Sequence, residues 1–314
     1  MNSGFDLAIL IPLLQATIRM ATPYTLAAIA GIYSEKAGVI SIELEGILLI
    51  GAFAGFAGAY FTHSLWLGVL IAVAFGVALA AIYAFMTVNL GCKQALIGTA
   101  IVLLASGITS FFYRSLFGIS SNIASVTPLK NFKLPILGQI PLVGDIFFDQ
   151  NALVYLSYLL VAFTWFFYER TALGLSCRSV GENPYAADTL GLPVIKLRFI
   201  SVLVTGAIAA TGGAYMSIAT SSTFIENMSS EKGYGAFAII ILGRYRPIGA
   251  FLGCLLYGFA DALQLNLQAT GINVPYQFML MLPYLFTLVV MFISGKGEKP
   301  EGLGKFFEKG ALLE

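Results

Sequence analysis

Polar side chains that could bind a solute or act as acids and bases interrupt the apolar stretches of this chain. Tyr257, Asp261, Gln264 and Gln268 recur at intervals of four, three and four residues, which places them on one face of a helix. A polar group surrounded by hydrocarbon is costly unless it has a partner. This polar stripe therefore predicts either the lining of a solute pathway or a structural polar network.

Other charged residues extend this pattern to two further apolar stretches. Gln15 and Arg19 are four residues apart and share a helix face, so Arg19 is a candidate partner for Asp261. Glu43 and Glu45 stand at the entry to the second stretch. Residues two apart do not share a face, and no histidine, lysine or nucleophile accompanies them. We interpret Glu45 as part of a polar hinge at the inner mouth of a pathway rather than as a catalytic acid.

Motifs for nucleotides, cofactors and metals are missing from the sequence. There is no G-x-x-x-x-G-K-[ST] phosphate-binding loop and no dinucleotide fingerprint. Three irregularly spaced cysteines and a single histidine argue against a zinc site and a disulfide framework. A net charge of +1 gives no indication of nucleic-acid binding. We therefore expect no catalysis, metal or cofactor in this chain, and active transport would need an ion gradient or a separate ATPase.

The composition indicates that membrane-spanning helices position these polar residues. The chain is 58% hydrophobic and only 11% charged, which is far from the norm for soluble domains. Apolar runs of ~20 residues can each cross a bilayer core of ~30 Å. Spacings such as Gly51/Gly55 and Gly249/Gly253 predict close helix contacts. The sequence thus predicts an all-α, polytopic membrane protein with about nine (8–10) transmembrane helices. The expected spans are 7–33, 40–61, 65–89, 94–117, 151–168, 197–220, 233–243, 248–268 and 276–294.

The distribution of basic residues predicts the orientation, because lysine and arginine favour the cytoplasmic side. With the N-terminus outside and the C-terminus inside, only Arg114, Lys130, Lys133 and Lys232 fall outside, and Arg19 lies within the first span. The stretch 233–243 is short for a span and could be a half-helix. If it crosses the membrane, the basic residues that follow it, Arg244 and Arg246, lie on the cytoplasmic side. The inner residues are Lys36, Lys93, Arg170, Arg178, Lys196, Arg198, Arg244, Arg246, Lys296, Lys299, Lys305 and Lys309.

Two connections between spans differ from ordinary turns. The proline-containing stretch 118–150 is expected on the outer side, as a passive connector or as a docking surface for an external partner. The polar stretch 169–198 is expected inside. Within it, Asn183-Pro184 predicts a helix start and Gly191 a helix stop, so we expect a two-turn helix from Pro184 to Leu190. Such a helix could seat in a groove of a separate motor protein.

Several segments of the chain resemble a known family. RSVGENPYAADTLGL (178–192), GVISIELEGILLIGAF (38–53) and GYGAFAIIILGRYRPIGAFLGCLLYG (233–258) resemble inner-membrane permeases of bacterial ABC importers, specifically the branched-chain amino acid, ribose and simple-sugar permeases. PILGQIPLVGDIFFDQNALVYL (135–156) is similar to the nucleoside-uptake branch. The resemblance covers nearly the whole chain and departs from the common N-I-G-L-E-G pattern at Glu43.

The resemblance implies a single transmembrane permease domain over 1–314 with a type II ABC importer-like bundle, a cytoplasmic tail at 295–314, and a place in the bacterial cytoplasmic membrane. It implies three protein partners besides membrane lipid: an ABC ATPase subunit that binds ATP and Mg, a second permease subunit that is the same or homologous, and an extracytoplasmic solute-binding lipoprotein. By resemblance, the residues of the coupling loop that meets the ATPase are Arg178, Gly181, Glu182, Asn183, Pro184, Ala187 and Gly191.

The expected cargo is a nucleoside or a similar small sugar-bearing solute. The expected pathway residues are Tyr257, Asp261 and Gln264, together with Glu45 and Arg19. An ion-coupled secondary transporter is the alternative, with Asp261, Glu45 and Arg19 as its coupling charges. That alternative predicts that uptake is lost when the ion gradient is dissipated, whereas the importer predicts loss on ATP depletion.

Overall fold

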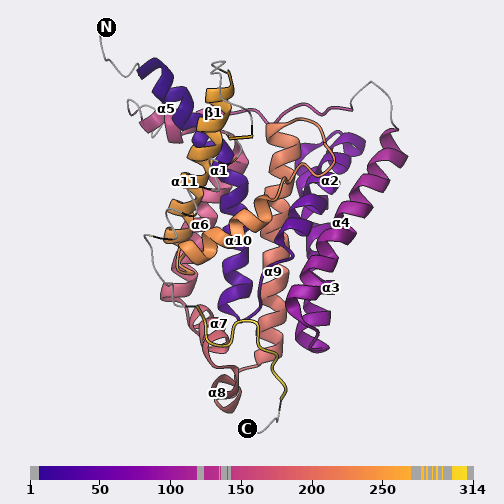
Figure 1. Ribbon diagram of the computed structural model, residues 1–314, viewed down its shortest axis with the longest axis vertical. Helices are drawn as coiled ribbons and strands as arrows, with labels where there is room; N and C mark the ends of the chain where they lie inside the picture. The colour runs from indigo at the N-terminus through magenta and orange to yellow at the C-terminus, as the bar shows by residue number, and fades with distance from the viewer. Residues whose placement is uncertain are drawn as a thin grey trace.

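The structure, a computed structural model, is a helical bundle that is elongated in one direction (Figure 1). It describes residues 7–118, 124–133, 143–269 and 299–309, together with the single positions 135, 140, 277, 278, 281, 285, 288 and 292. The predicted span 276–294 lies mostly outside the described residues. The elements are α1 Leu7–Lys36, α2 Leu44–Thr62, α3 Leu65–Ala84, η1 Phe85–Asn89, α4 Gln94–Phe117, β1 Phe132–Lys133, α5 Val143–Phe147, β2 Asp149–Gln150, α6 Ala152–Arg170, α7 Ala172–Glu182, α8 Pro184–Thr189, α9 Val194–Ala214, η3 Tyr215–Thr220, α10 Lys232–Leu242 and α11 Pro247–Ala269.

Six helices in the described part of the chain are long and apolar enough to cross a membrane. They are α2, α3 with its π-helical extension η1, α4, α6, α9 with its π-helical extension η3, and α11. Each coincides with a stretch that the sequence predicts as a span. The thirty residues of α1 form a helix where the first span is predicted. The total of nine spans and the orientation remain predictions.

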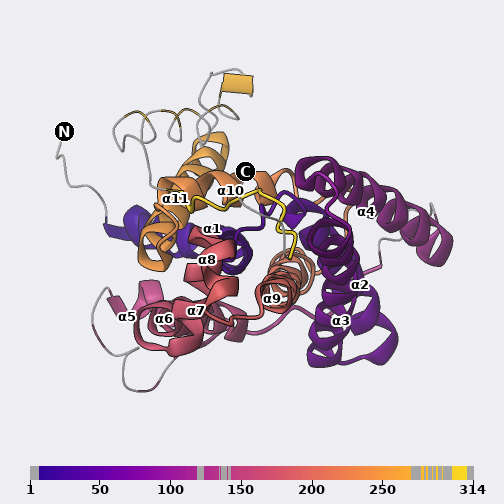
Figure 2. The same ribbon diagram turned by 90° about the horizontal axis from the view of Figure 1, so that it is seen from below.

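The core of the bundle surrounds α1 and α9. Leu26 and Ile32 of α1 are fully buried, and so is Val202 of α9. α1 packs on α9, α10 and α11, while α9 also packs on α2 and α3. Seen along the bundle, α9 lies between the group formed by α2 and α3 and the group that contains α1 and α6 (Figure 2). The outward side of α4, in contrast, exposes large apolar residues such as Leu103, as expected of a surface that faces lipid or another subunit.

Glycines make these contacts close, as the small-residue spacing predicts. A Cβ atom at Gly51 would collide with the backbone of Ala210 on α9, and one at Gly249 would collide with the carbonyl of Gly243. Gly76 of α3 and Gly206 of α9 face each other in the same way. The prediction of close helix packing is therefore confirmed at Gly51 and Gly249.

The two unusual connections lie at opposite ends of the bundle (Figure 1). At one end, β1 and β2 form an antiparallel ladder that pairs Phe132 with Gln150 and Lys133 with Asp149, next to the short helix α5. At the other end lie α7, α8 and the C-terminal segment 299–309. This arrangement agrees with the predicted separation of 118–150 and 169–198 onto different sides.

One element of the polar stretch was missed by the sequence analysis. The residues before Asn183, expected to be a loop, form α7 (Ala172–Glu182). The signal was present, because the hydroxyl of Thr171 accepts a hydrogen bond from the amide of Gly174 at 3.0 Å, as a helix-capping threonine does. The predicted short helix is therefore the second half of a helical pair.

Candidate functional site

The polar stripe of α11 lines a cavity within the bundle. Tyr257, Asp261 and Gln264 form part of the wall of a 270 Å³ cavity, with Tyr24 of α1 and Lys232 of α10 among the other wall residues. The sequence analysis predicted that these three stripe residues share a face, and the structure brings them to one cavity. Their role in solute passage remains a prediction.

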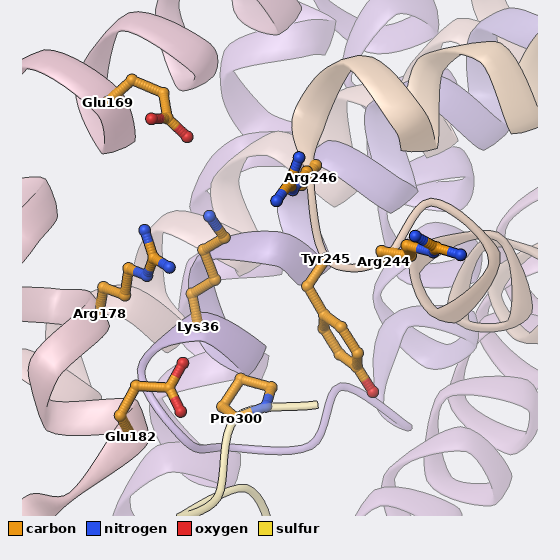
Figure 3. Close-up of a pocket in the computed structure, with 8 residues that line it drawn as sticks. All are labelled: Lys36, Glu169, Arg178, Glu182, Arg244, Tyr245, Arg246 and Pro300. Atoms are coloured by element: carbon orange, nitrogen blue, oxygen red, sulfur yellow. The ribbon is translucent and has the colours of Figure 1, made fainter. Parts of the chain in front are cut away.

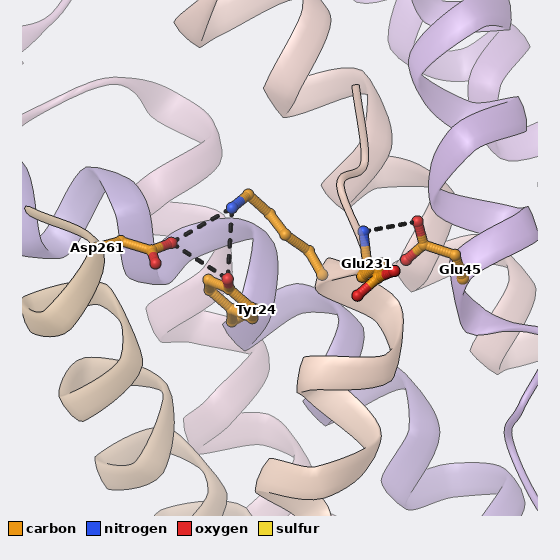
Figure 4. Close-up of polar contacts among 5 residues, drawn as sticks. Tyr24, Glu45, Glu231 and Asp261 are labelled. Carbon is orange, nitrogen blue, oxygen red and sulfur yellow. Dashed lines mark hydrogen bonds and ion pairs between the residues drawn. The ribbon is translucent and has the colours of Figure 1, made fainter. Parts of the chain in front are cut away.

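A cation from α10, Lys232, joins this cluster, and dashed lines mark its contacts with Tyr24 and Asp261 in Figure 4. Lys232 Nζ lies 3.3 Å from Asp261 Oδ2 and donates a hydrogen bond of 3.3 Å to the hydroxyl of Tyr24. The Tyr24 hydroxyl in turn donates to Asp261 Oδ2 at 3.1 Å. The ammonium also lies 4.8 Å from the centre of the Tyr24 ring, within range of a cation–π interaction. The side chains of Lys232 and Asp261 are 20% and 15% exposed, so water reaches this ion pair only partly.

The expected pairing of Arg19 with Asp261 is wrong. In the described part of the chain, Asp261 forms its ion pair with Lys232. Arg19 contributes its backbone carbonyl to a different contact, a 3.2 Å hydrogen bond from the hydroxyl of Tyr215. Helical spacing placed Arg19 on a polar face of α1, but Tyr24 is the α1 residue that reaches Asp261. Side-chain partners across three helices cannot be read from the periodicity of one helix.

Glu45 caps the start of α10. Its Oε1 accepts a hydrogen bond of 3.1 Å from the amide of Glu231, and its Oε2 accepts one of 2.7 Å from the amide of Gly233. These amides belong to the exposed donors at a helix N-terminus, where a carboxylate is favourable. Gly233 is required by the close approach, since a Cβ atom there would meet the backbone of Glu45. The carboxylate of Glu45 thus ties the first turn of α2 to α10.

This contact corrects the predicted positions of Glu45 and Lys232. The sequence analysis placed Glu45 at the inner boundary and Lys232 outside, on opposite sides of a core of ~30 Å. Residues joined by a 2.7 Å hydrogen bond at Gly233 cannot be so far apart. The physical reason is that α10 has only 11 residues, or ~16 Å at the usual rise. It lies across the middle of the bundle rather than spanning it (Figure 1), as the half-helix interpretation allowed.

The predicted helix in the polar stretch is confirmed as α8, Pro184–Thr189, with Leu190 as its C-cap. The Asn183 side-chain oxygen accepts a hydrogen bond from the amide of Ala186 at 3.0 Å, and Pro184 occupies the first turn. Gly191 has φ +83°, the left-handed conformation that glycine adopts readily at a helix end. The local capping signals therefore determine both ends of α8.

The predicted ATPase-coupling residues divide into an inward and an outward group. Gly181, Pro184 and Ala187 are buried, and a Cβ atom at Gly181 would collide with the carbonyl of Lys36. The outward residues are Arg178, Glu182, Asn183 and Gly191. Beside them, Leu190 is 81% exposed at the tip of α8. An apolar side chain this exposed at the end of a short helix suits the centre of a docking contact.

The C-terminal segment 299–309 holds this helical pair in place, a contact that the sequence analysis missed. The amide of Gly302 donates to the carbonyl of Gly181 at 2.9 Å, and Arg198 Nη1 of α9 donates to the carbonyl of Lys305 at 2.8 Å. Phe307 is 4% exposed and packs its ring 5.2 Å from that of Tyr185. The remaining members of this apolar cluster are Val180, Ala187 and Val194. We call α7, α8 and 299–309 the coupling module.

The residues that the structure describes contain no group of three or more histidine, cysteine, aspartate or glutamate side chains that could hold a metal ion. The α11 cavity offers groups that can bind a solute: two tyrosine rings with centres 5.4 Å apart, the carboxylates of Glu231 and Asp261, and the ammonium of Lys232.

The family model described as "Branched-chain amino acid transport system / permease component" matches residues 13–294. The chain belongs to this permease family. It is therefore the transmembrane subunit of an ABC importer, a multi-pass protein of the cell membrane that performs no catalysis and needs no cofactor of its own. The resemblance and the expected absence of enzymatic activity are confirmed by this match. The ion-coupled alternative is not retained.

The permease is similar to several described proteins over most of its length. It is 35% identical to the guanosine ABC transporter permease NupQ of Bacillus subtilis, over 97% of this chain and 98% of that protein. It is 34% identical to the nucleoside ABC transporter permease NupC of Lactococcus lactis, over 90% and 92%. The "Putative glucose ABC transporter permease protein TsgC13" of Haloferax volcanii is 36% identical, over 89% and 90%.

A solved structure shares the fold of this permease. The inward-facing conformation of a "putative metal-chelate type ABC transporter" superposes with a TM-score of 0.50 at 18% identity, covering 90% of this chain and 86% of the other. This likeness supports a type II ABC importer-like bundle.

Proposed function

We propose that this permease carries nucleosides, or closely related sugar-bearing solutes, along a path that includes the α11 cavity. The observation that carries the proposal is the tyrosine pair Tyr24 and Tyr257, 5.4 Å apart, beside the Lys232–Asp261 ion pair. Aromatic faces stack on nucleobases, while a carboxylate accepts hydrogen bonds from sugar hydroxyls. Guanosine and nucleoside permeases among the similar proteins support the same class of cargo. A putative glucose permease is similar at the same level of identity, so a hexose is the alternative cargo.

The dimensions of the cavity support a shared site. Its 270 Å³ is slightly below the ~300–1,000 Å³ of ordinary ligand pockets. A second permease, identical or homologous, would complete the walls of the path. The cavity of one subunit then supplies half of the contacts that the solute makes.

The energy would come from a separate ABC ATPase that docks on the exposed tip of α8. Motor movement would reach the bundle through the buried side of the coupling module, because Gly181 rests against the end of α1 and the segment 299–309 joins α7 to α9. A solute-binding lipoprotein would deliver cargo at the opposite end, near α5 and the β1–β2 ladder. That end carries an ion pair between Lys133 and Asp145, 2.6 Å apart and half exposed.

A competition experiment tests the cargo. The permease is reconstituted with its second permease, ATPase and binding protein, and ATP-driven uptake of labelled uridine is measured against unlabelled guanosine, ribose and glucose. We expect guanosine to compete and both free sugars to fail. Competition by glucose without competition by guanosine would refute the proposed cargo.

A matched pair of variants tests the role of the aromatic face. Tyr257→Phe keeps the ring, whereas Tyr257→Leu removes it. A base–aromatic stack contributes about 1–3 kcal/mol, so we expect Tyr257→Leu to raise the uridine concentration for half-maximal uptake by about fivefold or more. Tyr257→Phe should have a smaller effect. Equal effects of the two variants would show that the ring does not contact the solute.

A further inference from the structure

A second cavity, distinct from the α11 cavity, lies at the end of the bundle that carries the coupling module (Figure 3). Its volume is 420 Å³, within the ~300–1,000 Å³ typical of small-molecule sites. Four parts of the chain that are distant in sequence form it: the end of α1, the region from the end of α6 to the end of α7, the turn between α10 and α11, and the C-terminal segment. The wall residues are Lys36, Glu169, Arg178, Glu182, Arg244, Tyr245, Arg246 and Pro300.

The wall of this basic cavity carries an excess of positive charge, with four cationic side chains against two carboxylates. The side chains of Lys36, Arg178 and Arg246 point towards the same central space (Figure 3). Within the described residues, these three form no ion pair with a carboxylate. Glu182 is partly engaged elsewhere, because its Oε2 accepts a hydrogen bond from the amide of Glu301 at 3.3 Å.

The burial of Lys36 makes the excess of positive charge in the basic cavity energetically unfavourable. The residue is 7% exposed, and its ammonium lies 4.5 Å from the centre of the Tyr168 ring, which offers a weaker interaction than an anion. Burial of a cation is unfavourable, and the attraction of Glu169 and Glu182 for Lys36 is opposed by the repulsion of Arg178 and Arg246. An anion in the cavity would supply the missing charge to Lys36 and to the two guanidinium groups together.

The turn that presents Arg246 is backbone-strained. Arg244 and Tyr245 have φ of +54° and +57°, a left-handed conformation that is uncommon for residues other than glycine. The turn is held by hydrogen bonds from the amide of Arg244 to the carbonyl of Ile241 (3.0 Å) and from that of Tyr245 to that of Ile240 (2.9 Å). Strain of this kind concentrates at ligand clamps and active sites. Here it directs Arg246 towards Lys36 and Arg178.

We infer that the basic cavity binds a phosphate-bearing anion, either a soluble phosphorylated metabolite or the headgroup of an anionic lipid. Guanidinium groups recognise phosphate oxygens through paired hydrogen bonds, and a lysine adds a compact charge. The bound phosphate would bridge α7 of the coupling module to the turn that follows α10. The site is separate from the solute path, and the inference does not depend on which cargo the permease carries.

The experiment uses the complete transporter in lipid nanodiscs, with three probes and two lipid compositions. Binding of labelled uridine 5′-monophosphate and of inorganic phosphate is measured in phosphatidylcholine discs. Co-purified phosphatidylglycerol is measured by native mass spectrometry in mixed discs. Arg246→Gln removes one exposed guanidinium from the wall, Arg246→Lys keeps its charge, and Arg170→Gln is the matched control, because Arg170 is exposed at the end of α6 outside the cavity.

We expect one probe to bind saturably, with affinity about tenfold lower in Arg246→Gln, equivalent to about 1.4 kcal/mol. Arg246→Lys should fall between, and Arg170→Gln should match the unmodified protein. A response to the nucleotide identifies a soluble ligand, and a response only to phosphatidylglycerol identifies a lipid headgroup. Two results would overturn the inference: no binding of any of the three probes above the Arg246→Gln level, or loss of the ATPase from Arg246→Gln without any anion binding, which would assign the cations to a protein contact.

Discussion

Substitution of Asp261 by asparagine tests whether the Lys232–Asp261 pair holds α10 in the middle of the bundle. The charged atoms are 3.3 Å apart and the side chains are 20% and 15% exposed. At an effective dielectric constant of ~20, Coulomb's law gives an attraction of about 5 kcal/mol. Desolvation offsets most of it, and the partial exposure reduces it further. We expect Asp261→Asn to lower the free energy of unfolding by about 1–2 kcal/mol, because Lys232 would then have only neutral partners, the Tyr24 hydroxyl and the asparagine amide oxygen.

The assay is a double-mutant cycle on the purified permease, followed by thermal unfolding in detergent. Lys232→Met and Asp261→Asn should each lower the melting temperature by a few degrees, and the double variant should lose less than the sum of the two. Removal of Arg114 provides the control, because its ion pair with Glu226 is exposed and should contribute much less stability than the partly buried Lys232–Asp261 pair. Strictly additive effects, or an unchanged melting temperature in Asp261→Asn, would refute this reasoning.

Three further predictions concern the coupling module and a surface loop. Gly181→Val should lower ATP-driven uptake and destabilise the protein by about 1–3 kcal/mol, because the added methyl groups collide with the carbonyl that ends α1; uptake and melting temperature equal to the unmodified protein would contradict it. Phe307→Ala should lower the free energy of unfolding by about 3–5 kcal/mol because the ring is 4% exposed, whereas Phe306→Ala at 44% exposure should lower it clearly less in the same unfolding assay. The Arg114 guanidinium lowers the pKa of Glu226 below its usual 4.5, so their contact is present above that pH and lost as pH falls through the lowered pKa. Arg114→Gln should therefore lower the melting temperature slightly above about pH 4.5, and the melting temperatures of the two proteins should converge as the pH falls through the lowered pKa of Glu226.

Sequence signals that act over a few residues predicted the ends of α8, the six candidate spans and the polar helix face correctly. The bounds of α8 follow from the capping asparagine, the proline and the glycine at 183, 184 and 191, all of which act within one or two helical turns. The six candidate spans follow from apolar length alone. The shared face of Tyr257 and Asp261 follows from helical periodicity.

Contacts between distant segments could not be predicted in this way. Lys232 was assigned to the outer side because the orientation rule counts the basic residues beside each span. That rule does not account for a half-helix that begins within the bundle. The partner of Lys232, Asp261, is 29 residues away along the chain. The contact of Phe307 with α8 could not be predicted, because the C-terminal segment has no periodic apolar pattern. The two adjacent phenylalanines at 306 and 307 in this polar segment did indicate that it packs on an apolar surface.

The exposed tip of α8 allows the most direct test of the coupling proposal. Leu190 is 81% exposed, and full burial of a leucine contributes about 1.5–3 kcal/mol. We expect Leu190→Ser to weaken association with the ATPase by about ten- to a hundredfold and to lower ATP-driven uptake, with an unchanged melting temperature. Leu190→Met, which retains the apolar contact, should behave like the unmodified protein. Normal ATPase binding and normal uptake in Leu190→Ser would contradict the proposal that α8 is the joint between motor and permease.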